Sequence, residues 1–187
     1  MNDSSLKGQL LIASPRLDSP LFARSVVLVL EHDEEQGAKG IILNLLTSAT
    51  MTDLAGKLFD EDFAWEKPLH LGGPVAGPLL VLHTQPTMAD LEVFSGVYVA
   101  IDATKSQHLI AEEAEPSLVV ANFSGWAPGQ LEQEIADDVW MVAPADSRLI
   151  FADGDPDLWW TTLRGARARA LRALVRLPHV PSDPSMN

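Results

Sequence analysis

Short apolar runs rich in β-branched residues recur along the chain, and turn-forming residues separate them. Apolar runs of roughly four to eight residues bounded by Gly, Pro or Asp are typical of buried strands. A hairpin is predicted where the acidic segment 32–37 joins the second run to the third. The predicted strands cover residues 8–14, 25–31, 39–44, 79–83, 96–101, 117–123 and 140–143, and a shorter apolar stretch covers 69–71.

Polar capping residues and an apolar period near 3.6 predict four helices. Thr50, with Asp53 three residues later, matches the polar start of the first. Asp102 and Thr104 are both candidates to cap the second, which we expect to end before Pro116. The predicted helices cover residues 50–59, 105–115, 130–137 and 157–177, and the acidic segment 60–66 is predicted to be a loop.

The last predicted helix carries an apolar stripe on one face and arginines on another. The stripe comprises Trp159, Leu163, Ala166, Ala170, Leu174 and Leu177, and the basic face comprises Arg169, Arg172 and Arg176. We expect the stripe to pack on the core. We also expect Gly165 to break the helix in two, because an interior glycine costs about 1 kcal/mol relative to alanine.

The mixture of strands and helices predicts an α+β fold, in which short helices pack against one mixed β-sheet. Residues 1–177 are expected to form a single compact domain. A chain of 187 residues buries enough surface for one core without a disulfide or a metal. Residues 178–187, which contain three prolines, are predicted to be a tail.

Composition excludes several classes of protein. The chain has no cysteine, which removes disulfide scaffolds, thiolate metal sites and cysteine nucleophiles. Its apolar runs are far shorter than the ~20 residues that span a bilayer. No secretory signal is visible at the N-terminus. We therefore expect a cytoplasmic protein without a membrane partner.

The net charge of −13 is unevenly distributed along the chain. Residues 1–163 hold 8 basic and 25 acidic residues, a net −17, whereas residues 164–187 hold 5 and 1, a net +4. An acidic body repels phosphate backbones, so direct nucleic-acid binding is disfavoured. The arginine-rich C-terminal segment is the exception, but its apolar stripe favours docking on the core.

Residues 123–135 are the most informative segment, because a strand end, a glycine turn and a tryptophan precede a helix. One interpretation is a structural corner that buries Trp126, and such corners are commoner than ligand sites. The other is a site at which backbone N–H groups at the helix start bind an anion or a carbonyl oxygen. Glu132 and Glu134 would oppose a bound anion.

Gly72-Gly73-Pro74 forms a second glycine turn, which either connects two strands tightly or lets the backbone approach a ligand. The groove between this turn and the segment 124–130 is the predicted binding surface. Its predicted residues are Gly72, Gly73, Ser124, Gly125, Trp126, Gly129 and Gln130.

No catalytic constellation is legible in the sequence. Ser124 lies between a strand and a helix, but a nucleophile elbow needs glycine where this chain has Asn122 and Trp126. The five histidines show no metal-ligand spacing, and we expect His32 and His83, at strand ends, to hydrogen-bond the neighbouring main chain. The sequence therefore predicts no metal and no cofactor, and it identifies no catalytic residue.

A series of motifs nevertheless carries a family resemblance over about residues 8–165. The motifs are LLIASP at 10–15, FARSV at 22–26, EH at 31–32, GIILN at 40–44, GGPV at 72–75 with VLH at 81–83, and GWAPGQLE at 125–132 with EI at 134–135 and Trp140. In this order they resemble the motif series of the AlgH/YqgE family of bacterial proteins. Each motif alone is weak, but six in register are specific.

The resemblance implies a compact, cytoplasmic α+β protein from a family without an established biochemical activity or catalytic residues. The family's label of transcriptional regulator arose from a genetic association with alginate control, not from a demonstrated DNA-binding module. This chain also departs from the family pattern. Leu45-Leu46 follow Asn44 where a basic residue and proline are usual, and Asn122-Phe123 replace a usual Gly-Tyr.

We therefore expect a non-enzymatic cytoplasmic regulatory or adaptor protein that binds a small molecule or a protein partner. One alternative is a cryptic hydrolase, which would need Ser124 close to a histidine. Another is a transcriptional regulator that acts directly on DNA, but the net charge disfavours it and no helix-turn-helix is legible.

Overall fold

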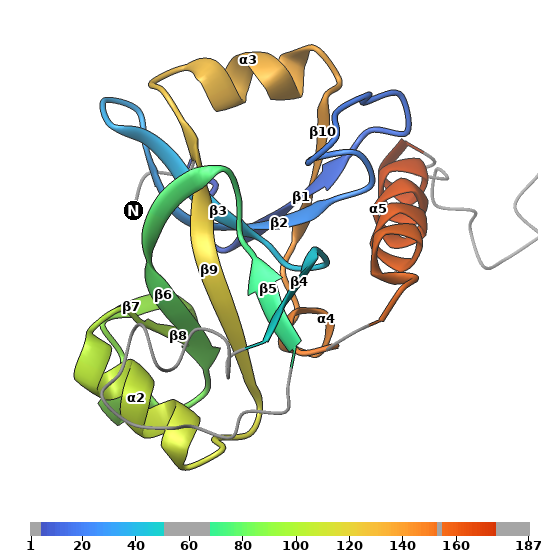
Figure 1. The fold of residues 1–187 in the computed structure, drawn as a ribbon. Coiled ribbons are helices and arrows are strands. Elements are labelled where there is room, and N and C mark those ends of the chain that lie inside the picture. Colours follow the sequence, from blue (N-terminus) through green and yellow to red (C-terminus); the bar gives the residue numbers. More distant parts are fainter. Residues whose placement is uncertain (1–4, 51–67, 153–154, 175–187) are drawn as a thin grey trace, which may run out of the picture.

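The computed structural model describes residues 5–50, 68–152 and 155–174, which form one sheet with helices packed against it (Figure 1). The strands are β1 (Gln9–Ala13), β2 (Val26–Asp33), β3 (Gly37–Ile42), β4 (Leu46–Thr50), β5 (Pro68–Leu71), β6 (Val75–His83), β7 (Leu91–Phe94), β8 (Val97–Ala100), β9 (Ser117–Trp126) and β10 (Trp140–Pro144). The helices are η1 (Pro86–Met88), α2 (Ala103–Ala111), α3 (Gln130–Ala136), α4 (Ser147–Ile150) and α5 (Leu158–Leu174).

The sheet has the order β10-β1-β2-β3-β9-β6-β8-β7, with β5 attached to β9 and β4 attached to β5. The β5–β9 pair is parallel and the other pairs are antiparallel. The predicted mixed sheet of an α+β protein is therefore confirmed. The predicted hairpin of the second and third strands is also present, as β2 and β3.

The long strand β9 organises the centre of the sheet. Its C-terminal residues 124–126 pair with β3, and its residues 120–121 pair with β5 along the same edge. Its other edge pairs with β6. The segment between β5 and β6, which contains the Gly72-Gly73 turn, is thereby brought against the second half of β9.

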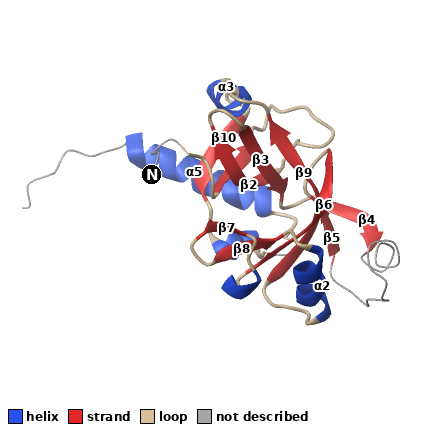
Figure 2. Ribbon diagram, turned by 90° about the vertical axis from the view of Figure 1, so that its left-hand side faces the viewer, coloured by secondary structure: helices blue, strands red, loops and turns tan. Residues whose placement is uncertain are grey.

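Both faces of the sheet are covered, as the alternation of buried residues requires. In β1, Leu10 and Ile12 join a core cluster that includes α5, whereas Leu11 joins a cluster that includes Leu131 of α3. Helix α2 packs on a third cluster around Val81. Figures 1 and 2 both show α2 and α3 at opposite ends of the sheet.

Helix α5 docks through the N-terminal part of its apolar stripe. Trp159, Leu163 and Ala166 are buried, and the Trp159 indole N–H donates to the carbonyl of Ala13 at 2.9 Å. Ala170 is exposed, so the buried stripe is shorter than the sequence predicted. The prediction that Gly165 breaks the helix is wrong, because α5 continues through it. Packing on the sheet outweighs the modest cost of one glycine.

Helix α2 is shorter and starts earlier than predicted. The Asp102 side chain accepts hydrogen bonds from the backbone N–H groups of Thr104 and Lys105, so of the two candidate caps Asp102 is the N-cap and Thr104 is not. The helix ends at Ala111 rather than near Pro116. The sequence predicts neither β4, whose residues LTSAT form no apolar run, nor β7, which has only four residues and lies at the edge of the sheet.

The predicted end of the strand at residue 123, before the glycine turn of the segment 123–135, is also corrected. Ser124, Gly125 and Trp126 continue β9 and pair with β3, so the turn before α3 comprises only residues 127–129. Cross-strand hydrogen bonds to β3 keep this segment extended, and sequence periodicity cannot anticipate such partners.

Several predictions fall outside the described residues. These are the helix after Thr50, the loop at 60–66 and the tail at 178–187. Among the described helices, none is long and apolar enough to cross a membrane.

Candidate functional site

The two glycine turns singled out in the sequence are neighbours. The Gly72 N–H donates to the carbonyl of Ala121 at 2.8 Å, and the Gly72 carbonyl accepts from Ile42 N–H and from Ser124 Oγ, each at 2.9 Å. A Cβ atom on Gly73 would lie 2.3 Å from Ser124 Oγ. The close approach of these two backbones explains why glycine occupies both positions.

A pocket of about 360 Å³ opens beside this junction. Its lining comes from the loop after β1, Pro74, the end of β9, α3 and the start of β10. Its described lining residues are Leu17, Ser19, Phe22, Pro74, Gly125, Trp126, Gln130, Glu134, Val139 and Trp140.

The predicted site residues divide into two groups. Gly125, Trp126 and Gln130 line the pocket, together with Pro74 from the first turn. Gly72, Gly73 and Ser124 are buried in the junction, and Gly129 is the N-cap of α3 with a φ of 75°. The structure therefore brings both turns to one place, but only three of the seven residues face the pocket.

The Glu134 carboxylate is the polar centre of the pocket. Its Oε2 accepts from the indole N–H of Trp126 at 2.8 Å and from that of Trp140 at 2.7 Å. Its Oε1 accepts from the Gln130 side-chain amide at 2.8 Å. Gln130 and Glu134 share a helix face because they are four residues apart, and Gln130 Oε1 in turn accepts from Ala127 N–H at 3.0 Å.

Three aromatic rings line the same pocket as this carboxylate. The rings of Phe22 and Trp140 meet edge to face with centroids 5.8 Å apart, and those of Trp126 and Trp140 meet similarly at 6.1 Å. Edge-to-face contacts and the shared hydrogen bonds to Glu134 hold the rings in fixed positions. The wall of the pocket thus combines three mutually packed aromatic rings with aliphatic residues and a few polar groups.

Sequence reasoning missed most of this constellation. Glu134 was considered only as a charge opposing an anion, and Phe22 and Trp140 were not assigned to a site. The spacing of Gln130 and Glu134 was visible in the sequence. That both indole N–H groups would converge on one carboxylate was not visible, because Trp126 and Trp140 lie on different strands with α3 between them.

A second carboxylate of α3, Glu132, is hydrogen-bonded to a histidine of β2. The backbone N–H of Leu6 donates to His32 Nδ1 at 3.1 Å, so His32 Nε2 carries the proton that it donates to Glu132 Oε1 at 2.6 Å. The pKa of Glu132 is lowered, first by its own backbone N–H and then by His32. Burial opposes this shift.

The histidines at strand ends contact the main chain, as the sequence predicted. His32 does so through Leu6, and His83 Nδ1 accepts from Gln85 N–H at 3.2 Å. Burial lowers the pKa of His83. Within the described ranges, no three His, Asp or Glu side chains converge as a metal site requires.

Ser124 is poorly placed to act as a nucleophile. Its side chain is 1% exposed, and its hydroxyl donates to the Gly72 carbonyl. A catalytic serine needs its proton directed at a base and its oxygen directed at substrate. The hydroxyl instead ties the Gly72 turn to β9.

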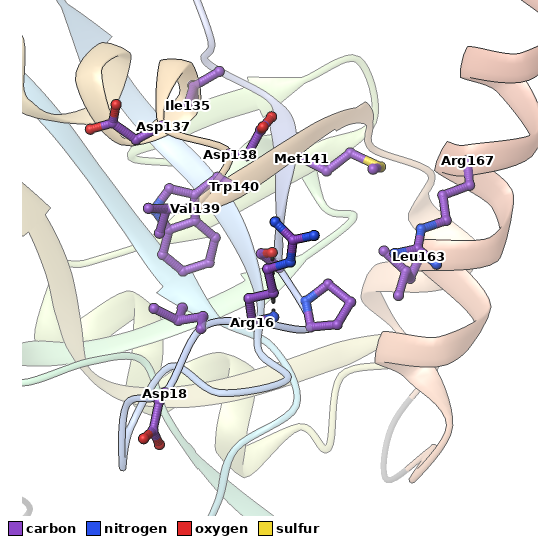
Figure 3. Close-up of a pocket in the computed structure, with 13 residues that line it drawn as sticks. Arg16, Asp18, Ile135, Asp137, Asp138, Val139, Trp140, Met141, Leu163 and Arg167 are labelled. Carbon is purple, nitrogen blue, oxygen red and sulfur yellow. Dashed lines mark hydrogen bonds between the residues drawn. The ribbon is translucent and has the colours of Figure 1, made fainter.

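A larger pocket of about 780 Å³ adjoins the first (Figure 3). The two share Leu17, Val139 and Trp140. Figure 3 shows Arg16 extending from the loop after β1 and Arg167 extending from α5. Asp18, Asp137 and Asp138 also line the larger pocket, so it mixes exposed charges of both signs and selects no single ligand charge.

Comparisons with known proteins match nearly the whole chain. A family model described as AlgH-like matches residues 10–170. The protein YqgE of Escherichia coli K12 is 36% identical over 166 residues, which cover 83% of this chain and 88% of that protein. A Chlamydia felis protein is 35% identical over 168 residues, which cover 84% and 85%.

Two solved structures share the fold. The solution structure of AlgH from Pseudomonas aeruginosa has a TM-score of 0.75 and 26% identity, and the match covers 96% of this chain and 98% of that one. A crystal structure from Corynebacterium diphtheriae has a TM-score of 0.70 and 24% identity, covers 88% of each chain, and supports the fold alone. Both sequence and fold therefore point to the same group of proteins.

Proposed function

This chain belongs to the AlgH/YqgE family of uncharacterised function, and from that premise we propose that it is a non-enzymatic regulatory or adaptor protein of the cytoplasm. We propose that it recognises its ligand in the pocket beside Trp126 and Trp140. The ligand is a small molecule or a side chain of a protein partner. Nucleic acid and membrane are not its partners.

The observation that carries this proposal is the hydrogen-bonded Glu134 carboxylate in an aromatic pocket. A volume of about 360 Å³ lies within the range of small-ligand sites, and such sites combine apolar walls with few fixed polar groups. Trp126, Trp140 and Gln130 keep the carboxylate in one orientation. Preorganised polar groups of this kind favour selective binding, because little conformational entropy is lost in ordering them when the ligand binds.

The contacts of the polar groups support binding rather than catalysis. Ser124 directs its proton to a backbone carbonyl, and Glu134 accepts from three neutral donors. General-base catalysis requires a group free to take a proton from substrate. Neither residue is arranged for that task.

The test is a two-dimensional NMR screen of the ¹⁵N-labelled protein against water-soluble cationic, anionic and neutral fragments. The expected result is that hits shift the indole N–H signals of Trp126 and Trp140 more than those of Trp159 and Trp160. Hits that shift only signals remote from the pocket, such as those around Arg167, would overturn the proposed site.

A matched pair of variants on one helix completes the test. Gln130→Ala removes a hydrogen-bond donor to the Glu134 carboxylate and is expected to weaken the binding of the fragments that hit the pocket. Gln133→Ala removes a hydrogen bond to Asp137 outside the pocket and is expected to leave them unchanged. Equal effects of the two substitutions would contradict a role for Gln130 in the site.

A further inference from the structure

The charge of the pocket is set by one residue. Among its described lining residues, Glu134 alone is ionisable, because the others are apolar residues, Gly, Ser, Gln and Trp. No described Lys, Arg or His lies within ion-pair distance of Glu134. His32 donates its hydrogen bond to Glu132 on the same helix, not to Glu134. The carboxylate therefore carries a negative charge that only neutral donors contact.

The hydrogen bonds of Glu134 leave one acceptor position open. An ionised carboxylate offers about four lone-pair sites, two on each oxygen. Oε2 accepts from the two indoles, and Oε1 accepts from Gln130. One site on Oε1 thus remains for a further donor, and a charged donor would also neutralise the carboxylate.

The walls of the pocket suit the rest of such a ligand. The rings of Phe22, Trp126 and Trp140 all line it, and aromatic rings attract cations as well as apolar groups. The net charge of −13 adds a long-range attraction for cations. Anions are disfavoured by the same charges.

We propose that this pocket binds a small organic cation, an ammonium or guanidinium group on a compact apolar body, whose charge pairs with the Glu134 carboxylate. This inference rests on the proposed function, since it names the ligand class of the same pocket. A free small molecule is the occupant that fits, because the pocket is near the lower limit of small-ligand volumes.

The test compares ligands of one shape and different charge on the unaltered protein. The ¹⁵N-labelled protein is titrated with choline, butylammonium and methylguanidinium, and with 3,3-dimethylbutan-1-ol, the neutral isostere of choline. At least one cation is expected to shift the Trp126 and Trp140 indole signals saturably. If choline is that cation, its neutral isostere should bind at least about tenfold more weakly than choline. Added NaCl should weaken the binding of the cation, because salt screens its attraction to the carboxylate.

Two variants assign the effect to one carboxylate. Glu134→Gln keeps the size of the side chain and removes its charge, so the cation should bind about tenfold more weakly. Glu112→Gln removes an equal charge from the exposed C-cap of α2, away from the pocket, and should leave binding unchanged. If Glu134→Gln does not fold, the comparison of choline with its isostere decides alone.

The results distinguish a failure of the inference about charge from a failure of the proposed binding site. If the isostere and choline shift the same two indoles with equal affinity, the pocket binds ligands but the inference about charge is overturned. If no cation shifts these indoles while neutral fragments do, the inference fails and the proposed site stands. If neither cations nor fragments shift them, both are overturned. A peptide containing lysine that binds where the free cations do not would also overturn the small-molecule assignment.

Discussion

Single glycines determine how closely the backbones around the pocket approach each other. Gly37, at the start of β3, has a φ of 84°, and a Cβ atom there would lie 2.1 Å from the carbonyl oxygen of Trp126. Gly72 and Gly73 face similar obstruction from β9. The second half of β9, which ends at Trp126, therefore fits beside the pocket because Gly37, Gly72 and Gly73 leave room for its backbone.

This steric role predicts a difference between two glycines with the same φ. Gly37→Ala is expected to lower the free energy of unfolding by about 3 kcal/mol, from backbone strain and overpacking together. Gly96 also has a φ of 84°, but nothing lies within 4 Å of its Cβ position. Gly96→Ala should therefore cost only about 1 kcal/mol, the strain alone. Urea unfolding measures both, and equal losses would contradict the steric role of Gly37.

At the scale of elements, the start of α2 is held by two aspartates. Asp90 Oδ2 accepts from the backbone N–H groups of Ile101 and Asp102, at 2.7 and 2.8 Å, and Lys105 pairs with the same carboxylate. Asp102 then caps the helix. These bonds lower the pKa of Asp90 to about 2, with the Asp102 N–H the largest cause, followed by Lys105. The contacts of Asp90 with Ile101, Asp102 and Lys105, here called the Asp90 clamp, join the start of β7 to the end of β8 and to α2.

The depressed pKa of Asp90 predicts how stability responds to acid. A carboxyl whose pKa is about 2 when folded and 3.8 when unfolded stabilises the fold above about pH 4. That contribution is lost as pH falls from about 4 towards about 2. Asp90→Asn is expected to lower the melting temperature at neutral pH and to flatten its decline over that window. Glu112→Gln is the control, and a decline in Asp90→Asn as steep as in the parent protein would contradict the clamp.

At the scale of the whole molecule, the charge is unevenly distributed: residues 1–163 are acidic, whereas α5 carries exposed arginines. Helix α5 packs through Trp159 and Leu163 on the sheet, and its described arginines, Arg164, Arg167, Arg169 and Arg172, are exposed. The rest of the chain carries the excess of Asp and Glu. A duplex that approached these arginines would also meet the repulsion of the acidic body.

This balance predicts that the protein does not bind duplex DNA directly. Nonspecific duplex binders have dissociation constants of about 10⁻⁴ to 10⁻⁶ M even at physiological salt. Fluorescence anisotropy of a random labelled duplex at low salt should stay unchanged at micromolar protein. Saturable binding that weakens steeply with added salt would contradict the prediction. In that case, loss of binding in Arg169→Ala with Arg172→Ala would assign it to α5.

The sequence alone determined the local features of this protein. Its short apolar runs predicted seven of the strands, its glycine turns marked the two segments that meet at β9, and its motif series identified the family. These features are local or follow chain order, so the sequence expresses them directly. The α+β class follows from them.

Only the tertiary structure decided the binding pocket. Phe22, Pro74, Trp126 and Trp140 are far apart in the chain, and the strand order β10-β1-β2-β3-β9 brings them together. The two indoles converge on Glu134 because α3 crosses between the strands that carry them. The physical reason is that a period of two or 3.6 residues says which face a side chain occupies, whereas the pairing of distant strands decides which side chains meet there.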